Sequence, residues 1–291
     1  MNPAGENPRV AQVRELACLT TKRHTILAPF VIARDMWEHR NMLENFIRRD
    51  VKLQYMNSIA GYFWSLIEPL TLTVIYYIFF TMIVVRPSEA YAFWVIIGVL
   101  NWAFFTKTLT TSTASLMSAR GIIKQVYFPR EIFPVSKMFS NLFITCMSMV
   151  VLIPFMIRFD SEFNSNIALI PVGFALTGCL ALGLGMALAP FNAKFQDVSH
   201  IVRISVRAGF FLSPVMWTIE MAQEGSRAAY LDYILLNPMV IPISMVRSGF
   251  TGTSFHVEPF FMWYSVIFCV GSLLFGSMIF YKSESKAVKH L

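Results

Sequence analysis

Long stretches without a charged residue are the feature that most constrains the fold of this chain. Seven such runs cover residues 69–85, 91–106, 138–157, 163–193, 208–219, 233–246 and 259–281. A helix needs about 20 mostly apolar residues to cross the hydrocarbon core of a bilayer. Four runs reach this length with their flanking polar residues, as 66–85, 138–157, the middle of 163–193 and 259–281. Because 56% of the residues are hydrophobic and only 14% are charged, the sequence predicts an integral membrane protein.

Two further runs are borderline in length. The run 91–106 extends past Lys107, and the run 208–219 extends back through Arg207 and Arg203. The long side chains of these cations can reach the membrane surface, so their presence does not exclude a span. With these two runs, we count six spans.

The run 233–246 is too short to cross a membrane, and Asn237, Pro238 and Pro242 interrupt it. We expect a re-entrant or interfacial element here, because irregular backbone at membrane depth must be buried in protein or line a water-filled cavity. The predicted fold class is therefore an all-α membrane protein, with six transmembrane helices and short re-entrant helices before the last span.

An amphipathic helix is predicted before the first span, from residue 36 to 55. At 100° per residue, large apolar side chains share one broad arc and basic and polar ones fill the other, which suits a helix on the membrane surface. Asp50 falls inside the apolar arc, so we expect it to contact protein through a basic residue of the cytoplasmic side. These patterns divide the chain into a loosely ordered cytoplasmic arm (1–35), an interface helix (36–58), a six-span domain (59–282) and a cytoplasmic tail (283–291).

The basic residues indicate on which side of the membrane the ends lie. Nine Lys and Arg residues occur in the first 65 positions, four between predicted spans two and three, three around the fourth connection and three in the tail, which is 19 of the 24. By the positive-inside rule, both termini lie in the cytoplasm and the chain spans the cytoplasmic (inner) membrane. Attraction to the anionic inner leaflet explains the net charge of +7, so nucleic-acid binding need not be invoked.

Residue types that carry catalysis or bind metals are not grouped in the sequence. The five histidines are scattered, and no HExxH, Walker A or GxSxG motif occurs. The four cysteines have neither disulfide partners nor metal-ligand spacing. Glu68 and Lys107 are expected at span ends, which argues against an ion-coupled carrier. We expect that the chain is not an enzyme and that it binds no cofactor or metal itself.

Aromatic residues make up 15% of the chain, and many lie in the predicted spans. A path lined by rings without fixed charge would suit a sugar chain, because the apolar faces of sugars stack on aromatic rings. The alternative is that the rings pack the bundle or anchor it at the interface. The candidates for a path are Tyr62, Phe63, Trp64, Tyr76, Trp94, Trp102 and Phe105. Asn101 and the Thr/Ser series 106–115 would bind sugar hydroxyls in the first interpretation and bond within their own helix in the second.

Small residues crowd the fourth predicted span. Ala181 and Gly185 form a small-xxx-small pair, which allows close approach of another helix. We expect internal packing of the bundle, and the alternative is a subunit interface.

Three segments, in order along the chain, match the pattern of a known family. They are RRDVKLQYMNSIAGYFWSLIEPL (48–70), GIIKQVYFPREIFPVSKMFSNL (121–142) and LLNPMVIPISMVRSGFTG (235–252). They resemble the opening segment, the cytoplasmic Phe-Pro segment and the segment before the last span in the membrane subunits of ABC-2-type polysaccharide exporters. The resemblance runs from about residue 36 to the tail, and it is strongest to exporters of O-antigen or teichoic-acid-like glycans.

This resemblance implies a homodimer of six-span permeases that works with two copies of a separate ATPase. ATP would bind to that partner subunit. The substrate would be a polysaccharide on a polyprenyl diphosphate lipid, moved outward from the cytoplasmic leaflet. Membrane lipids would be further partners.

The resemblance also implies roles for particular residues. It places 50–55 in the interface helix, although Gln54 stands where many members have Arg. ATP-driven closure would push on the loops 118–137 and 192–203 and open an aromatic-lined path at the dimer interface. The candidates for ATPase coupling are Gly121, Lys124, Phe128, Pro129, Arg130, Glu131 and Asp197. The candidates at an outer mouth built of re-entrant helices are Asn237, Pro238 and Arg247.

Arg48, Arg49 and Lys52 are candidates for attracting the diphosphate headgroup at the inner surface. The alternative is simple contact with anionic lipids.

Two other functions stay open from the sequence. One is an ABC-2 exporter of small lipids or drugs. The other is a membrane-embedded transferase acting on lipid-linked sugars, for which Asp50, Glu68 and Asp197 are the acid or base candidates, although they share no motif.

Overall fold

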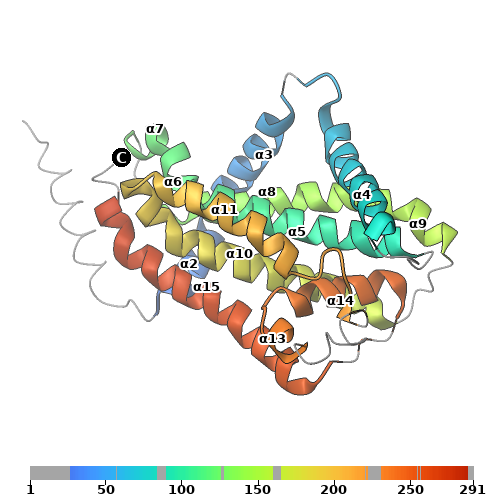
Figure 1. Cartoon of the computed structure of the whole chain (residues 1–291). Coiled ribbons are helices and arrows are strands. Elements are labelled where there is room, and N and C mark those ends of the chain that lie inside the picture. The colour runs from blue at the N-terminus through green and yellow to red at the C-terminus, as the bar shows by residue number, and fades with distance from the viewer. Residues whose placement is uncertain are drawn as a thin grey trace, which may run out of the picture.

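The computed structural model describes residues 27–56, 58–83, 90–125, 128–159, 165–219, 221, 231–253, 255 and 257–287. Every regular element in these ranges is a helix, and the helices form an elongated bundle (Figure 1). Four of the described helices are long and apolar enough to cross a membrane: Tyr91–Thr113, Ile132–Arg158, Ser165–Lys194 and Pro259–Glu284. The prediction of an all-α membrane protein is confirmed.

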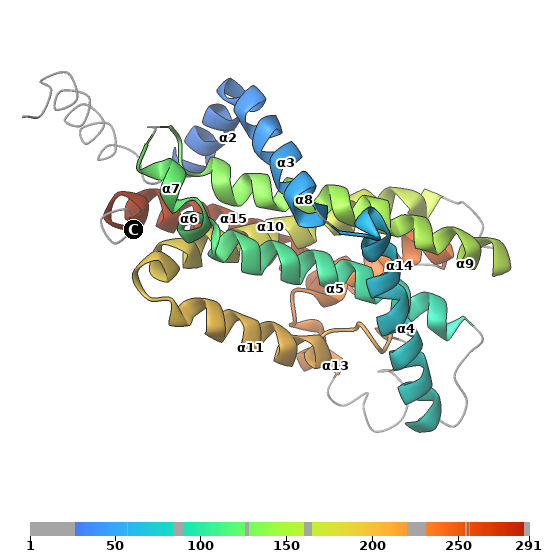
Figure 2. The same cartoon turned by 90° about the horizontal axis from the view of Figure 1, so that it is seen from above.

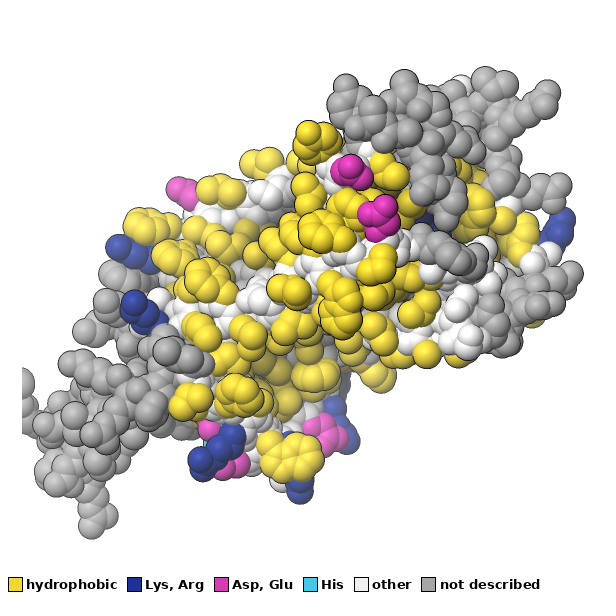
Figure 3. Space-filling model, turned by 90° about the horizontal axis from the view of Figure 1, so that it is seen from below, with side chains coloured by type: hydrophobic (Ala, Val, Ile, Leu, Met, Phe, Trp, Pro, Cys, Tyr) yellow, Lys and Arg dark blue, Asp and Glu magenta, His cyan; other side chains and the backbone are white. Residues whose placement is uncertain are grey.

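These four correspond to predicted spans two, three, four and six. They contain α5 (Tyr91–Thr113), α8 (Ile132–Ser148) continued by α9 (Leu152–Arg158), α10 (Leu169–Lys194) and α15 (Pro259–Ala287). Large exposed apolar side chains such as Trp263, Ile267 and Phe275 lie on α15. In Figure 3, hydrophobic side chains cover most of the described surface on one face of the molecule. Such a surface suits a hydrocarbon solvent.

The other two predicted spans are less complete, so six spans remain a prediction. The first corresponds to α4 (Trp64–Ile83), whose expected last two residues lie outside the described ranges. The fifth corresponds to α11 (Asp197–Leu212), which has 16 residues and does not continue to residue 219 as expected. It ends because Ser213 is extended (φ −101°, ψ 153°) before Pro214, and the residue before a proline is disfavoured in the helical conformation.

The amphipathic stretch before the first span differs from the expectation in two ways. It is two helices, α2 (Ala28–Glu38) and α3 (Arg40–Tyr55), which meet at His39. Residues 28–35, expected in the loosely ordered arm, are helical, and Ala28 and Ile32 are buried where α2 packs on α15. The domain boundaries as a whole remain predictions.

The run 233–246 lies in two short helices, of which the second is largely buried in protein and the first buries only Leu235. They are α13 (Leu231–Leu235) and α14 (Val240–Thr251), and the predicted break at Asn237 and Pro238 lies between them. Pro242 does not break α14, because it lies in the first turn, where a missing N–H costs least. Gly252 ends α14 in the left-handed conformation (φ 70°).

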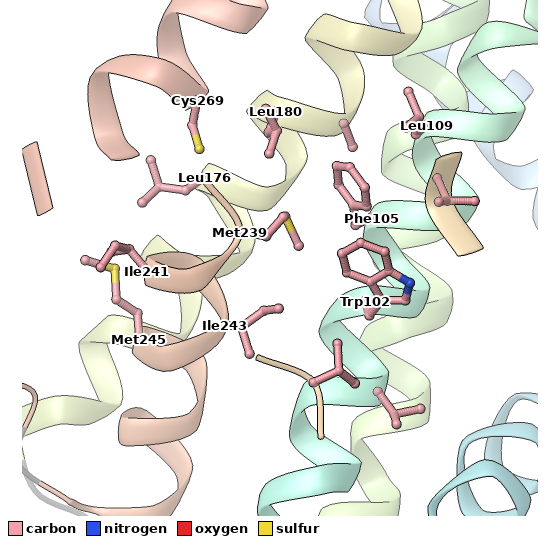
Figure 4. Packing of buried hydrophobic residues seen from close by; sticks show 14 of the residues in the cluster. Trp102, Phe105, Leu109, Leu176, Leu180, Met239, Ile241, Ile243, Met245 and Cys269 are labelled. Atoms are coloured by element: carbon pink, nitrogen blue, oxygen red, sulfur yellow. The ribbon is translucent and has the colours of Figure 1, made fainter. Parts of the chain in front are cut away.

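The core of the bundle surrounds α10 and α5. In Figure 4, Leu176 and Leu180 of α10 lie near Cys269 of α15, with Trp102 and Phe105 of α5 alongside. Glycine permits the closest approach, because a methyl group on Gly276 of α15 would overlap the Gly183 carbonyl of α10. Ala181 is fully buried and a methyl group on Gly185 would meet the Ser112 side chain, so the small residues pack within the chain, as expected.

Candidate functional site

Helix α11 carries two exposed arginines, Arg203 and Arg207, that form no ion pair with a described acid, and one buried edge packs the helix on α5. It lies beside α5 in Figure 2, with Val202 and Val206 buried in the cluster that contains Trp102. A side chain on Gly209 would meet the Trp102 ring, and the Phe210 ring lies 6.2 Å from it. Trp102 is near the midpoint of α5, so this part of α11 lies at the depth of the middle of an apolar helix that can span the membrane.

The two sides of α11 have opposite character. At 100° per residue, Arg203 and Arg207 lie on the same side of the buried edge as Phe210. The Phe210 ring lies 5.1 Å from the Tyr76 ring of α4, so this is the flank toward α4. Both arginines are exposed, and Arg203 donates to His200 Nδ1 at 3.0 Å. We call this side, with His200, Arg203 and Arg207, the basic flank.

The other side of α11 borders an apolar cavity of about 760 Å³. The cavity lies between α11, α5, α10, α13 and α15, and none of the described residues that line it is charged. Its walls include Trp102, Phe105, Leu180, Gly209, Leu212 and Phe268. The basic flank and the cavity are therefore separated by the helix itself.

A charged pair links α4 and α5. Lys107 Nζ lies 2.8 Å from Glu68 Oε2, and both side chains are partly exposed. Lys107 was expected at a span end, but it lies within α5, six residues before that helix ends at Thr113. Because each charge compensates the other, the pair is a tether between the two helices.

Only part of the polar series of α5 bonds within its own helix, as in the second of its two interpretations; the buried hydroxyls of Thr106, Thr108 and Ser115 have no hydrogen-bond partner among the described residues. Thr110 and Thr111 donate to the Thr106 and Lys107 carbonyls of their own helix at 2.7 and 2.6 Å. Asn101 is fully buried and accepts a hydrogen bond from Thr177 of α10 at 3.0 Å. The bonds of Thr110 and Thr111 are local to α5, whereas the bond between Thr177 and Asn101 links α10 to α5.

The predicted path aromatics lie in different environments. Tyr62, Phe63 and Trp64 are exposed before and at the start of α4, and the Tyr62 ring lies 4.8 Å from the Tyr55 ring. Trp94 is half-buried near the other end of the bundle.

Tyr76, Trp102 and Phe105 are brought together around Phe210, although Trp102 and Phe105 are buried. Sequence reasoning missed Phe210. Its signal was the helical spacing of four from Val206.

Two of the three candidates for headgroup attraction form ion pairs with acids of their own helix. Arg48 pairs with Glu44, and Arg49 Nη2 lies 2.9 Å from Asp50 and its guanidinium lies over the Phe46 ring. Lys52 is exposed. The expectation for Asp50 is confirmed, because its side chain is only 6% exposed and pairs with Lys137 of α8 at 2.8 Å.

The segment expected to couple to an ATPase packs against α3 and α15. It contains α6 (Ser115–Ser118) and α7 (Arg120–Ile123), with Gly121 and Lys124 exposed. The rings of Phe128 and Phe133 pack on Phe46 of α3 at 6.0 and 5.4 Å.

The end of this segment joins three elements through charged side chains. Arg130 lies 3.9 Å from Glu284 of α15, while Glu131 is 4% exposed and hydrogen-bonds Asp35 of α2. Burial, with the nearby carboxylates, raises the pKa of Glu131 to about 8. Pro129 is half-buried between these residues, whereas Asp197 lies apart from them, exposed in the first turn of α11.

The residues predicted at an outer mouth form hydrogen bonds with α5, with the end of α11 and the turn after it, and with α15. They are Asn237, Pro238 and Arg247. The buried Arg247 guanidinium donates to the carbonyls of Trp94, Pro214 and Trp217, at 2.8 Å in the case of Pro214. Asn237 Nδ2 donates to the Leu212 carbonyl at 3.0 Å, and the Pro238 carbonyl accepts a bond from Ser265 of α15. We call the Arg247 contacts the carbonyl clamp.

The acid and base candidates for a transferase are not brought together. Asp50 is paired with Lys137, Glu68 is paired with Lys107, and Asp197 lies on a third helix.

Comparison with known proteins gives a consistent result. The chain is 24% identical over 209 residues to the O-antigen export system permease protein RfbA of Myxococcus xanthus, which covers 72% of this chain and 80% of that protein. It is 26% and 25% identical over 239 residues to two RfbA permeases of Klebsiella pneumoniae, covering 80% of this chain and 88% of each relative. The predicted resemblance to O-antigen export permeases is confirmed. No family model matches the chain.

The similarity spans most of this chain and most of each of these permeases. The chain is therefore a multi-pass membrane protein similar to transport subunits.

Proposed function

We propose that this chain is the permease subunit of an ABC transporter that exports O-antigen across the inner membrane. The observation that carries the proposal is the similarity to O-antigen export permeases over 72% to 80% of the chain. The four apolar helices and the absence of a grouped acid and base among the transferase candidates agree with it.

The finer parts of the proposal concern assembly. Two copies would face each other across the flank formed by α4, α5 and α11, and the polysaccharide would pass between them. In support, the rings of Tyr76 and Phe210 pack together on this flank, and Tyr62, Phe63 and Trp64 are exposed at the start of α4. Six spans per copy, with both termini in the cytoplasm, would follow if α4 and α11 also cross in the dimer.

Two ATPase subunits would bind at the end of the bundle that carries α6 and α7. Movement there would be transmitted by the packing of Phe128 and Phe133 on Phe46 and by the contact between Arg130 and Glu284. ATP would bind to these partners, and the lipid-linked polysaccharide would be the substrate.

The first test is deletion of this chain combined with purification of the complex. We expect an ATPase to co-purify with the chain, and deletion to remove O-antigen from the cell surface while lipid-linked glycan accumulates inside. If lipid-linked glycan were absent from the deletion strain, the chain would act in synthesis and the proposal would be wrong.

A further inference from the structure

The basic flank of α11 places two arginines where charge is costly. Gly209 and Phe210 lie against Trp102 near the middle of α5, and Arg207 is only two residues before Gly209. An ionisable side chain at membrane depth needs a partner or a water-filled path. The stability of the charge on Arg203 and Arg207 therefore depends on the groups around them.

Among the residues that the structure describes, no carboxylate forms an ion pair with either arginine. Arg203 contacts His200, which is not an acid. Glu68 of α4 is already paired with Lys107. The basic flank therefore carries two positive charges for which the described chain supplies no counter-charge.

The geometry of the flank matches a phosphate-bearing ligand. Arg203 and Arg207 are four residues apart, so their side chains point from one face of α11. A guanidinium presents paired N–H donors that suit phosphate oxygens, and such charge-assisted bonds are the strong ones. The rings of Phe210 and Tyr76 lie on the same flank and provide stacking surfaces for a sugar beside the phosphates.

We propose that Arg203 and Arg207 bind the phosphate groups of a membrane-embedded lipid, deep on the α4 flank of α11. In the context of the proposed function, on which this assignment rests, the ligand is the diphosphate of the lipid-linked glycan. This site is distinct from Arg48 and Arg49 at the inner surface, which already pair with Glu44 and Asp50. Anionic phospholipid headgroups offer the same phosphate chemistry, and the test separates the two sources.

The binding test uses the permease purified with its ATPase in lipid nanodiscs, with farnesyl diphosphate as the probe and farnesol as the uncharged comparison. In phosphatidylcholine discs, we expect Arg203→Gln with Arg207→Gln to weaken farnesyl diphosphate binding at least tenfold, because two charge-assisted contacts are lost. Farnesol binding should not change. A matched control is Arg158→Gln with Lys282→Gln, which removes two exposed cations from α9 and α15 and should leave binding intact.

Equal binding of farnesyl diphosphate to the wild type and the Arg203/Arg207 double variant would overturn the site. Binding that persists in phosphatidylglycerol discs would identify the lipid-linked diphosphate as the occupant. Binding that phosphatidylglycerol suppresses in the wild type would support phosphate recognition and identify phospholipid headgroups instead.

Export assays separate this inference from the proposed function. We expect the double glutamine variant to co-purify with the ATPase but to lose surface O-antigen, and Arg203→Lys with Arg207→Lys to restore part of both binding and export. If deletion of the chain left surface O-antigen unchanged, the proposed function would fail. If deletion abolished it and the assembled glutamine variant exported normally, only the arginine site would fail.

Discussion

Arg207 of α11 and Arg247 of α14 are both arginines of the second half of the chain, yet their surroundings differ completely. Arg247 is buried, and its guanidinium donates to carbonyl oxygens of α5 and of the turn after α11. Arg207 is exposed on the basic flank, and no described carboxylate pairs with it. The comparison teaches that a cation whose donors are satisfied within the chain maintains the fold, whereas one without such partners is available to a ligand or a second subunit.

The largest expected effect comes from breaking the carbonyl clamp. Arg247→Met would leave the carbonyls of Trp94, Pro214 and Trp217 without their donor in a buried place. Each such carbonyl costs about 1–3 kcal/mol, so we expect a loss of about 4 kcal/mol in the free energy of unfolding. Thermal unfolding of the purified complex measures it. A loss no larger than that of Arg158→Gln would show that the clamp does not hold the turn.

The pair of Asp50 and Lys137 tests the same principle at the other end of the bundle. Lys137→Met would leave the buried Asp50 carboxylate with Arg49 alone, at a cost of about 3 kcal/mol. The double variant Asp50→Asn with Lys137→Met should recover most of this loss, because no uncompensated charge remains. A double-mutant cycle on thermal stability checks the prediction, and additive losses would contradict a direct pair.

Glu131 extends the comparison from buried cations to a buried acid. Its ordinary pKa is 4.5 and its pKa in the fold is about 8, so between these values the folded state binds more protons than the unfolded state. Stability therefore falls as pH rises through this window. The groups around Glu131 are Asp35 and Glu284, with Arg130 as the cation.

Glu131→Gln should remove that dependence. We expect the variant to be more stable than the wild type by on the order of 2 kcal/mol at pH 8 and similar to it at pH 5, since an amide mimics the protonated carboxyl. Thermal unfolding between pH 5 and 8 measures the difference. Parallel pH profiles for the two proteins would contradict the raised pKa.

The smallest effect on stability is expected at the basic flank. Arg203→Gln with Arg207→Gln should change the unfolding free energy in detergent by less than about 0.5 kcal/mol, because exposed side chains without an ion-pair partner contribute little to the fold. The same thermal assay measures this value. A loss as large as that of Arg247→Met would show that the two arginines maintain the fold, and their contrast with Arg247 would no longer hold.

Much of the fold could be predicted because it depends on local composition. The lengths of the apolar runs identified three of the four helices that are long and apolar enough to span a membrane, and the fourth, α5, came from a run of borderline length. The break at Asn237 and Pro238 separated α13 from α14. The end of α11 was missed although the Ser213-Pro214 step was visible, because continuous hydrophobicity was given more weight than the backbone preference before proline.

The candidate site was predicted less well because burial depends on neighbours. The buried position of Asp50 followed from its place in an apolar arc, but no pattern showed that Lys137 was its partner. Aromatic content likewise could not separate Trp102, which is buried, from Trp64, which is exposed.

By itself, the sequence determined that the chain is helical, that it is a membrane protein and that it resembles O-antigen export permeases. These properties follow from hydrophobic length and from motifs that are contiguous along the chain. Only the tertiary structure decided that Arg247 is bonded to carbonyls while Arg203 and Arg207 are not, because it alone places α14 against the turn after α11. The charge of a side chain follows from its residue type, but its hydrogen-bond and ion-pair partners come from distant parts of the chain.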